Sequence, residues 1–156
     1  MEGCCTGNVS VVTSCLADSN FDPNELTDSG RKRWGRRVTS TGFIEACYNG
    51  HREIVTLLLK DSRIDVKKGD KNGWTGFMYA CYSGHREIAR LLLKDSRIDV
   101  NKGDKNGWTG FMSACSNGHP EIVRLLLQDY RIDVNEAADA GKTGFLFACE
   151  NGERER

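Results

Sequence analysis

The chain has no excess of charge of either sign, no apolar run of membrane-spanning length and no secretory leader pattern. Lysine plus arginine and aspartate plus glutamate both number 22. This balance argues against nucleic acid or an anionic membrane as the main partner of the whole surface. Apolar runs such as Leu57 to Leu59 are far shorter than the roughly 20 residues that a bilayer span needs. The N-terminal MEGCCTGNVSVV lacks a basic start followed by a long apolar stretch, so we expect no secretory signal.

The cysteines lack the irregular spacing of a disulfide scaffold. Four of them, Cys47, Cys81, Cys115 and Cys149, lie 34 residues apart. The total of 7 is odd, and cysteine is among the most frequently buried residue types. We therefore expect free, buried thiols and a reducing compartment, which means the cytoplasm, with the nucleus as the alternative.

What the chain does contain is a 34-residue repeat. The segment 69–102 matches 103–136 at 26 of 34 positions, and Thr-Gly-Phe recurs at Thr41, Thr75, Thr109 and Thr143. A fixed period of this length is typical of stacked units that bury their apolar faces only against their neighbours. Such an array presents a long surface, so binding is the first function to consider.

One unit predicts two short helices. The turn residues 70–73 precede Thr75, a good helix N-cap, and apolar residues follow it at helical spacing. Gly84 ends this helix, and 85–94 predicts a second helix with a broad apolar stripe. An extended stretch, 98–100, leads to the next turn. Helices this short are not stable alone in water, so stacking must hold them.

These residues resemble the ankyrin repeat family. The matching positions in one unit are Asp104, Gly107, Thr109, Ala114, Gly118, His119, Ile122, Val123, 125–127, Asp133, Val134 and Asn135. The resemblance implies an all-α fold with β-hairpin loops: a solenoid of stacked helix-turn-helix units with hairpin fingers at right angles. The family's proline after the capping threonine is glycine here, as at Gly76, so we expect a softer array.

The repeat divides the chain into one ankyrin-repeat domain, 1–156. We expect a degenerate N-terminal half-repeat (1–26), a basic insert (27–40), three repeats (41–74, 75–108 and 109–142) and a C-terminal half-repeat (143–156). The last half-repeat lacks the helix that would cover part of Phe145 and Phe147. This predicts self-association, or capping by a partner, at that end.

Three motifs invite a chemical interpretation that the residues do not complete. Gly141-Lys142-Thr143 resembles the end of a phosphate loop, but Glu136 stands where the first glycine is needed. The Asp-x-Asn turns lack the glycine and glutamate of a calcium loop. Cys-His pairs such as Cys81 and His85 recur one per unit and cannot converge on one zinc ion. We therefore predict no catalytic residues, no metal site and no cofactor.

The strongest charge cluster is the basic insert, with Arg31, Lys32, Arg33, Arg36 and Arg37 around a tryptophan. It predicts either a solvated, partly disordered insert, which we favour, or a nuclear-import or nucleic-acid patch. The second possibility supports an alternative function, that of a nuclear or nucleic-acid-associated factor.

Aromatic residues mark the expected binding surface. Trp74 and Trp108 occupy a position that the family leaves variable and exposed, and Tyr48, Tyr79 and Tyr82 lie at free positions of the first helix. Exposed aromatic side chains are frequent interface anchors, although each Trp could instead pack on the adjacent hairpin. The differences Tyr79/Ser113 and Tyr82/Ser116 between near-identical units favour a role in specificity.

The sequence thus predicts a non-catalytic scaffold that binds a partner protein through its concave face and hairpin tips, with no membrane association. The expected protein-binding residues are Lys71, Asn72, Trp74, Tyr79, Tyr82, Lys105, Asn106, Trp108, Ser113, Ser116, Lys142 and Phe147. The family resemblance also implies that Asn101 and Asn135, in the Asp-Val-Asn turn, are candidates for hydroxylation.

Overall fold

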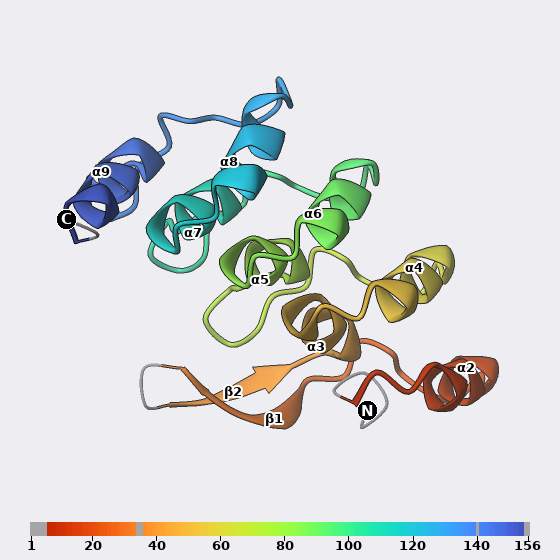
Figure 1. The fold of residues 1–156 in the computed structure, drawn as a ribbon. Coiled ribbons are helices and arrows are strands. Elements are labelled where there is room, and N and C mark those ends of the chain that lie inside the picture. The colour runs from red at the N-terminus through yellow and green to blue at the C-terminus, as the bar shows by residue number, and fades with distance from the viewer. Residues whose placement is uncertain (1–5, 34–35, 140, 155–156) are drawn as a thin grey trace.

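The computed structural model describes residues 6–33, 36–139 and 141–154, which form two rows of short helices (Figure 1). The first helices of the units are α3 (Gly42–Asn49), α5 (Gly76–Tyr82), α7 (Gly110–Ser116) and α9 (Gly144–Arg154). The second helices are α2 (Val9–Ala17), α4 (Arg52–Lys60), α6 (Arg86–Leu93) and α8 (Pro120–Leu127). Each helix contacts the next one in its row, and α3, α5 and α7 also contact the second helix of their own unit. The expected stack of helix-turn-helix units is confirmed.

Threonine side chains start the first helices. The Thr75 hydroxyl accepts a hydrogen bond from the Met78 backbone N–H at 3.4 Å. The equivalent bonds at Thr41, Thr109 and Thr143 measure 3.2 to 3.4 Å. α5 has only 7 residues, so stacking on its neighbours must stabilise it. No helix among the described residues has the length and apolarity needed to cross a lipid bilayer.

The glycine that replaces the family's proline lets the first helices approach closely. A Cβ atom at Gly76 would lie 2.8 Å from Cε1 of Phe43 in the preceding unit, and one at Gly110 would lie 2.9 Å from Cε1 of Phe77. The phenylalanine rings, both buried, occupy the space that a proline ring would need. Glycine at this position therefore accompanies a bulky aromatic residue in the neighbouring unit.

Arginine side chains join the second helices of neighbouring units. Each donates from Nη2 to a backbone carbonyl at or near the C-terminal end of the preceding unit's second helix: Arg63 to Leu16 (2.7 Å), Arg97 to Leu59 (2.9 Å) and Arg131 to Leu93 (2.6 Å). The last carbonyls of a helix have no partner within the helix. These arginines satisfy one such group at each junction and bridge the units.

An aspartate two residues earlier orients each bridging arginine. The Asp95 carboxylate accepts from Arg97 Nη2 at 2.7 Å, and Asp129 accepts from Arg131 Nη2 at 2.6 Å. Hydrogen bonding to Arg97 lowers the pKa of Asp95, and the same bond raises the pKa of Arg97. The Asp-x-Arg sequence therefore has a structural role at each unit junction.

The basic insert forms an antiparallel hairpin of β1 (Thr27–Arg33) and β2 (Arg36–Ser40), which leads directly into α3 (Figure 1). The register pairs Thr27 with Ser40 and Arg33 with Arg36, with an irregularity between Asp28 and Lys32. The expectation of a partly disordered insert is wrong for the described backbone of these two strands. The physical reason is that the ladder pairs backbone groups irrespective of side-chain charge.

Candidate protein-binding surface

A buried aspartate closes each of two loops, hereafter the fingers (69–75 and 103–109), that precede α5 and α7. Asp70 Oδ1 accepts from the backbone N–H groups of Asn72 (2.8 Å) and Trp74 (2.9 Å). Asp104 Oδ1 does the same for Asn106 (2.8 Å) and Trp108 (2.9 Å). These bonds fix the turn, so the finger tips have a defined geometry before any partner binds.

Backbone hydrogen bonds also join the first finger to the second, and the second finger to the loop that precedes α9. The Lys105 N–H donates to the Asn72 carbonyl at 3.0 Å, and the Asp139 N–H donates to the Asn106 carbonyl at 2.9 Å. Lys71, Asn72, Lys105 and Asn106, four of the expected binding residues, are exposed at the tips. The fingers therefore present a continuous polar edge.

The prediction that Trp74 and Tyr79 are exposed is wrong. Trp74 is 1% exposed and Tyr79 is fully buried, in a cluster with Ile44 and Met78. The Trp74 indole N–H donates to Asp104 Oδ2 in the next finger at 2.6 Å, and the Tyr79 hydroxyl donates to Asp70 Oδ2 at 2.8 Å. Each ring packs between units while its polar atom reaches a buried carboxylate, so neither is available to a partner.

The indole N–H of Trp108 has a different partner from that of Trp74, because the next unit lacks the matching aspartate. The residue 34 positions after Asp104 is Ala138, which has no carboxylate to accept the indole N–H. Trp108 Nε1 donates instead to the Ser113 hydroxyl at 2.9 Å, and its ring remains half-buried. Ser113 is fully buried, so its prediction as a surface contact is also wrong. The Tyr79/Ser113 difference therefore reflects packing rather than partner specificity.

Three half-buried aromatic residues, hereafter the aromatic row, lie at the end of α5 (Tyr82), just before α7 (Trp108) and in α9 (Phe147). The Trp108 and Phe147 rings lie 4.4 Å apart. Lys142 Nζ lies 5.5 Å from the Phe147 ring centroid and pairs with Glu150 at 2.7 Å. We define the finger surface as the aromatic row, half-buried Ser116 and Lys142, and the exposed finger tips. Its residues are Lys71, Asn72, Tyr82, Lys105, Asn106, Trp108, Ser116, Lys142 and Phe147.

The repeated cysteine and histidine residues contribute to packing and to contacts between units. Cys81 lies fully buried in the core, and burial raises the pKa of its thiol; burial also raises the pKa of Cys115, to about 11. His85 Nε2 hydrogen-bonds the Tyr48 carbonyl at 2.8 Å in the preceding unit. Cys15, Cys47, Cys81, Cys115 and Cys149 are all free thiols. Among the described residues, no three metal-ligand side chains form a group that could hold an ion.

The two asparagines that are candidates for hydroxylation differ in accessibility. Asn101 is half-buried; its side chain donates to the Arg131 carbonyl at 2.6 Å and accepts from the Asp133 N–H at 2.9 Å. Asn135 is exposed. Asn135 is therefore the more accessible of the two. For the basic insert only the backbone ladder is described, so the side chains of Arg31, Lys32, Arg33, Arg36 and Arg37 lie outside the described structure.

An apolar groove of about 450 Å³ opens beside the last unit and is hereafter the terminal groove. Its lining includes Phe111 and Val123, with Leu127 (57% exposed), Val134 and Phe145 (74% exposed). This exposure agrees with the expectation that Phe145 lacks a covering helix. Phe147 belongs instead to the finger surface.

Comparison with protein families agrees with this architecture. A family model for ankyrin repeats (three copies) matches residues 1–104 and 97–155, which together span nearly the whole chain. A search of curated proteins found no match to this chain. The repeated fingers, the two rows of helices and the threonine caps all lie within the matched segments.

Proposed function

This chain belongs to the ankyrin repeat family, and from that premise we propose that it is a non-catalytic scaffold that binds a partner protein through the finger surface. Members of this family are in general protein–protein interaction modules. The observation that carries the proposal is the row of half-buried aromatic rings beside exposed lysine and asparagine side chains on hydrogen-bonded fingers.

The finger surface combines two kinds of contact. Trp108 and Phe147 offer large apolar area on a rigid base, which is typical of the residues that dominate binding energy. Lys71, Lys105 and the neighbouring asparagines supply charge and hydrogen bonds, which set orientation more than affinity. Because the fingers are ordered by their own backbone bonds, binding requires little ordering of the loops.

We expect the double variant Trp108→Ala, Lys105→Ala to lose a partner that the wild type retains in a pull-down from the native source. The control is Arg124→Ala, which removes an exposed charge from α8, in the row of second helices. For the partner so identified, we expect binding about tenfold to thirtyfold weaker in the double variant, measured by calorimetry. Capture of the same proteins by the double variant would rule out the finger surface as the site.

We also propose self-association through the terminal groove. The exposed apolar side chains of Leu127 and Phe145 lie where a second helix of a following unit would cover them. Sedimentation velocity should show a mass that rises with concentration, and the variant Leu127→Ser, Phe145→Ser should shift it to monomer. A monomer mass independent of concentration would contradict this proposal.

The alternative is a nuclear or nucleic-acid-associated factor that acts through the basic hairpin. The register places Lys32 opposite Arg37 and Arg33 opposite Arg36 in the backbone ladder, so the sequence gathers four basic residues at one end of the hairpin. A cluster of basic residues is the sequence feature that a polyanion would recognise. Binding to duplex DNA with a steep salt dependence, lost when 31–37 is neutralised, would favour this alternative. For the scaffold function we propose a cytoplasmic location, and for this alternative function a nuclear one.

A further inference from the structure

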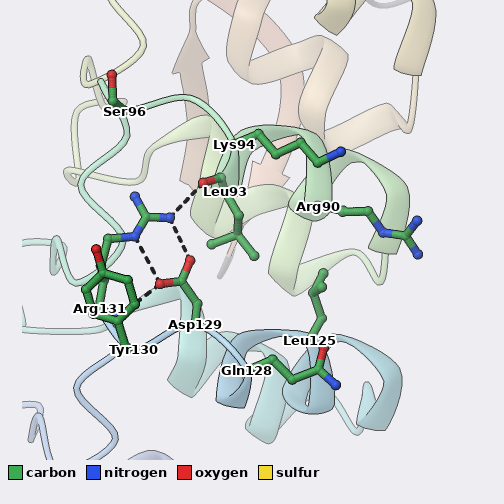
Figure 2. Close-up of a pocket in the computed structure, with 9 residues that line it drawn as sticks. All are labelled: Arg90, Leu93, Lys94, Ser96, Leu125, Gln128, Asp129, Tyr130 and Arg131. Atoms are coloured by element: carbon green, nitrogen blue, oxygen red, sulfur yellow. Dashed lines mark hydrogen bonds and ion pairs between the residues drawn. The ribbon is translucent and has the colours of Figure 1, made fainter.

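A second groove, of about 700 Å³, lies between α6 and α8, in the row of second helices and away from the finger surface. We name it the rear groove. Figure 2 shows Leu93 of α6 and Leu125 of α8 approaching from its two sides. Both leucines are half-buried, so the groove has an apolar interior that is open to solvent. The Arg131 bridge to the Leu93 carbonyl, drawn in Figure 2, holds the two units in a fixed spacing there.

The lining of the rear groove carries an excess of positive charge. Arg131 is neutralised by Asp129. Arg90 shares the Glu87 carboxylate with Arg86, at 3.2 and 3.1 Å, so one carboxylate serves two guanidinium groups. Lys94 is exposed, and its ammonium group forms no ion pair with any described residue. In a chain without net charge, this local excess favours an acidic partner.

The third feature of the rear groove is an exposed aromatic residue at its edge. Tyr130 follows α8 and is 97% exposed, so it contributes no packing to the folded chain. Figure 2 shows it beside Arg131, at the edge of the groove. An aromatic side chain displayed beside an apolar groove is typical of an interface rather than of a core.

Comparison with the preceding unit separates framework from unit-specific residues. The leucine, aspartate and arginine positions of the groove recur 34 residues earlier as Leu59, Leu91, Asp95 and Arg97. Arg90 and Tyr130, in contrast, correspond to Thr56 and Ser96. These two residues are therefore not needed for stacking, because the preceding unit stacks without them.

We propose that the rear groove binds an extended acidic segment of a partner protein that carries a large apolar side chain. The apolar side chain lies between Leu93 and Leu125 and against the Tyr130 ring, and the carboxylates pair with Arg90 and Lys94. This surface is separate from the finger surface. The chain can then hold two partners at once, one on each row of helices.

The test uses the full chain and a fluorescein-labelled peptide of alternating Asp and Glu with a central Leu-Phe pair. In fluorescence anisotropy we expect saturable binding that weakens with added salt. The double variant Arg90→Thr, Tyr130→Ser, built from the residues of the preceding unit, should bind about tenfold or more weakly. Arg124→Thr is the matched control, because it removes an arginine of α8 that does not line the groove, and its affinity should be unchanged.

Further measurements with altered peptides, the double variant and DNA decide the proposal. A peptide with lysine in place of every acidic residue, and one with Ser-Ser in place of Leu-Phe, should both bind at least tenfold more weakly than the probe. Equal binding of the probe by the double variant, with an unchanged thermal unfolding curve, would overturn the proposal. Tighter binding of an anionic DNA duplex than of the probe would also overturn it. None of these variants touches the finger surface, so failure here leaves the proposal for that surface intact.

Discussion

Replacement of Trp74 by alanine is expected to lower the free energy of unfolding by about 3–5 kcal/mol. Trp74 is 1% exposed and packs against Ile44, Met78 and Tyr79. Its indole also donates to Asp104 of the next finger, so truncation removes both apolar contact and an inter-unit hydrogen bond. Since a domain of this size is stable by only about 5–15 kcal/mol, the loss is a large fraction of the total. Urea denaturation followed by far-UV circular dichroism measures it.

Two control variants separate the contributions. Trp74→Phe keeps most of the ring but leaves Asp104 Oδ2 without the indole donor, so we expect a loss of about 1–3 kcal/mol. Trp108→Ala should cost less than Trp74→Ala, because the Trp108 ring is half-buried and its indole N–H donates to Ser113 of its own unit rather than to a residue of the next unit. Equal losses for the two alanine variants would contradict the assignment of Trp74 to the core between units.

Replacement of Gly84 by alanine is expected to destabilise the fold by about 2–4 kcal/mol, from backbone strain and a steric clash together. Gly84 has φ +80°, a conformation that alanine adopts poorly. A Cβ atom there would lie 2.9 Å from Cε1 of His119, and His119 is held by its bond to the Tyr82 carbonyl at 2.9 Å. The clash therefore displaces a side chain that links two units.

Gly118 is a matched control for the steric part of this prediction. Its φ is +66°, but a Cβ atom there would meet nothing within 4 Å. Gly118→Ala should therefore cost only the backbone strain, about 1–2 kcal/mol. Thermal unfolding of both variants gives the difference, which reports the His119 contact. Similar losses in the two variants would mean that the histidine moves aside at little cost.

The repeated cysteines and threonines illustrate how much a repeat can predict from local pattern. A cysteine that recurs at the same place in each unit is expected to have similar surroundings in each unit. Cys47, Cys81 and Cys115 are buried and free, but Cys149 is free and exposed, so the expectation of burial is wrong for that residue. Thr75, predicted as a helix N-cap, caps α5 as expected. The capping inference succeeds because a cap depends on a few neighbouring residues. Burial of the repeated cysteine depends also on the following unit, whose first-helix glycine lies near the sulfur atom at Cys47, Cys81 and Cys115.

The same reasoning failed for the aromatic residues, where a few substitutions in the same unit and in the next one change the surroundings of each ring. Trp74 and Trp108 occupy identical positions in near-identical units, yet one is buried and the other half-buried. Two differences accompany this. The accepting Asp104 is replaced by Ala138 one unit further along the chain, and Tyr79 and Tyr82, whose rings pack on Trp74, are replaced by Ser113 and Ser116. The tyrosine-to-serine changes are visible in the sequence, but that these rings cover Trp74, and that its acceptor is a carboxylate of the next unit, is known only from the structure.

The sequence by itself determined the period, the two helices of each unit, the threonine caps of the first helices and the free state of the repeated thiols. These properties follow from short-range preferences that every unit repeats. Only the tertiary structure decided which aromatic rings remain accessible, how the basic segment folds and where the rear groove opens. Those outcomes depend on which side chains of neighbouring units meet, and a contact between units is a property of the stack rather than of any one copy.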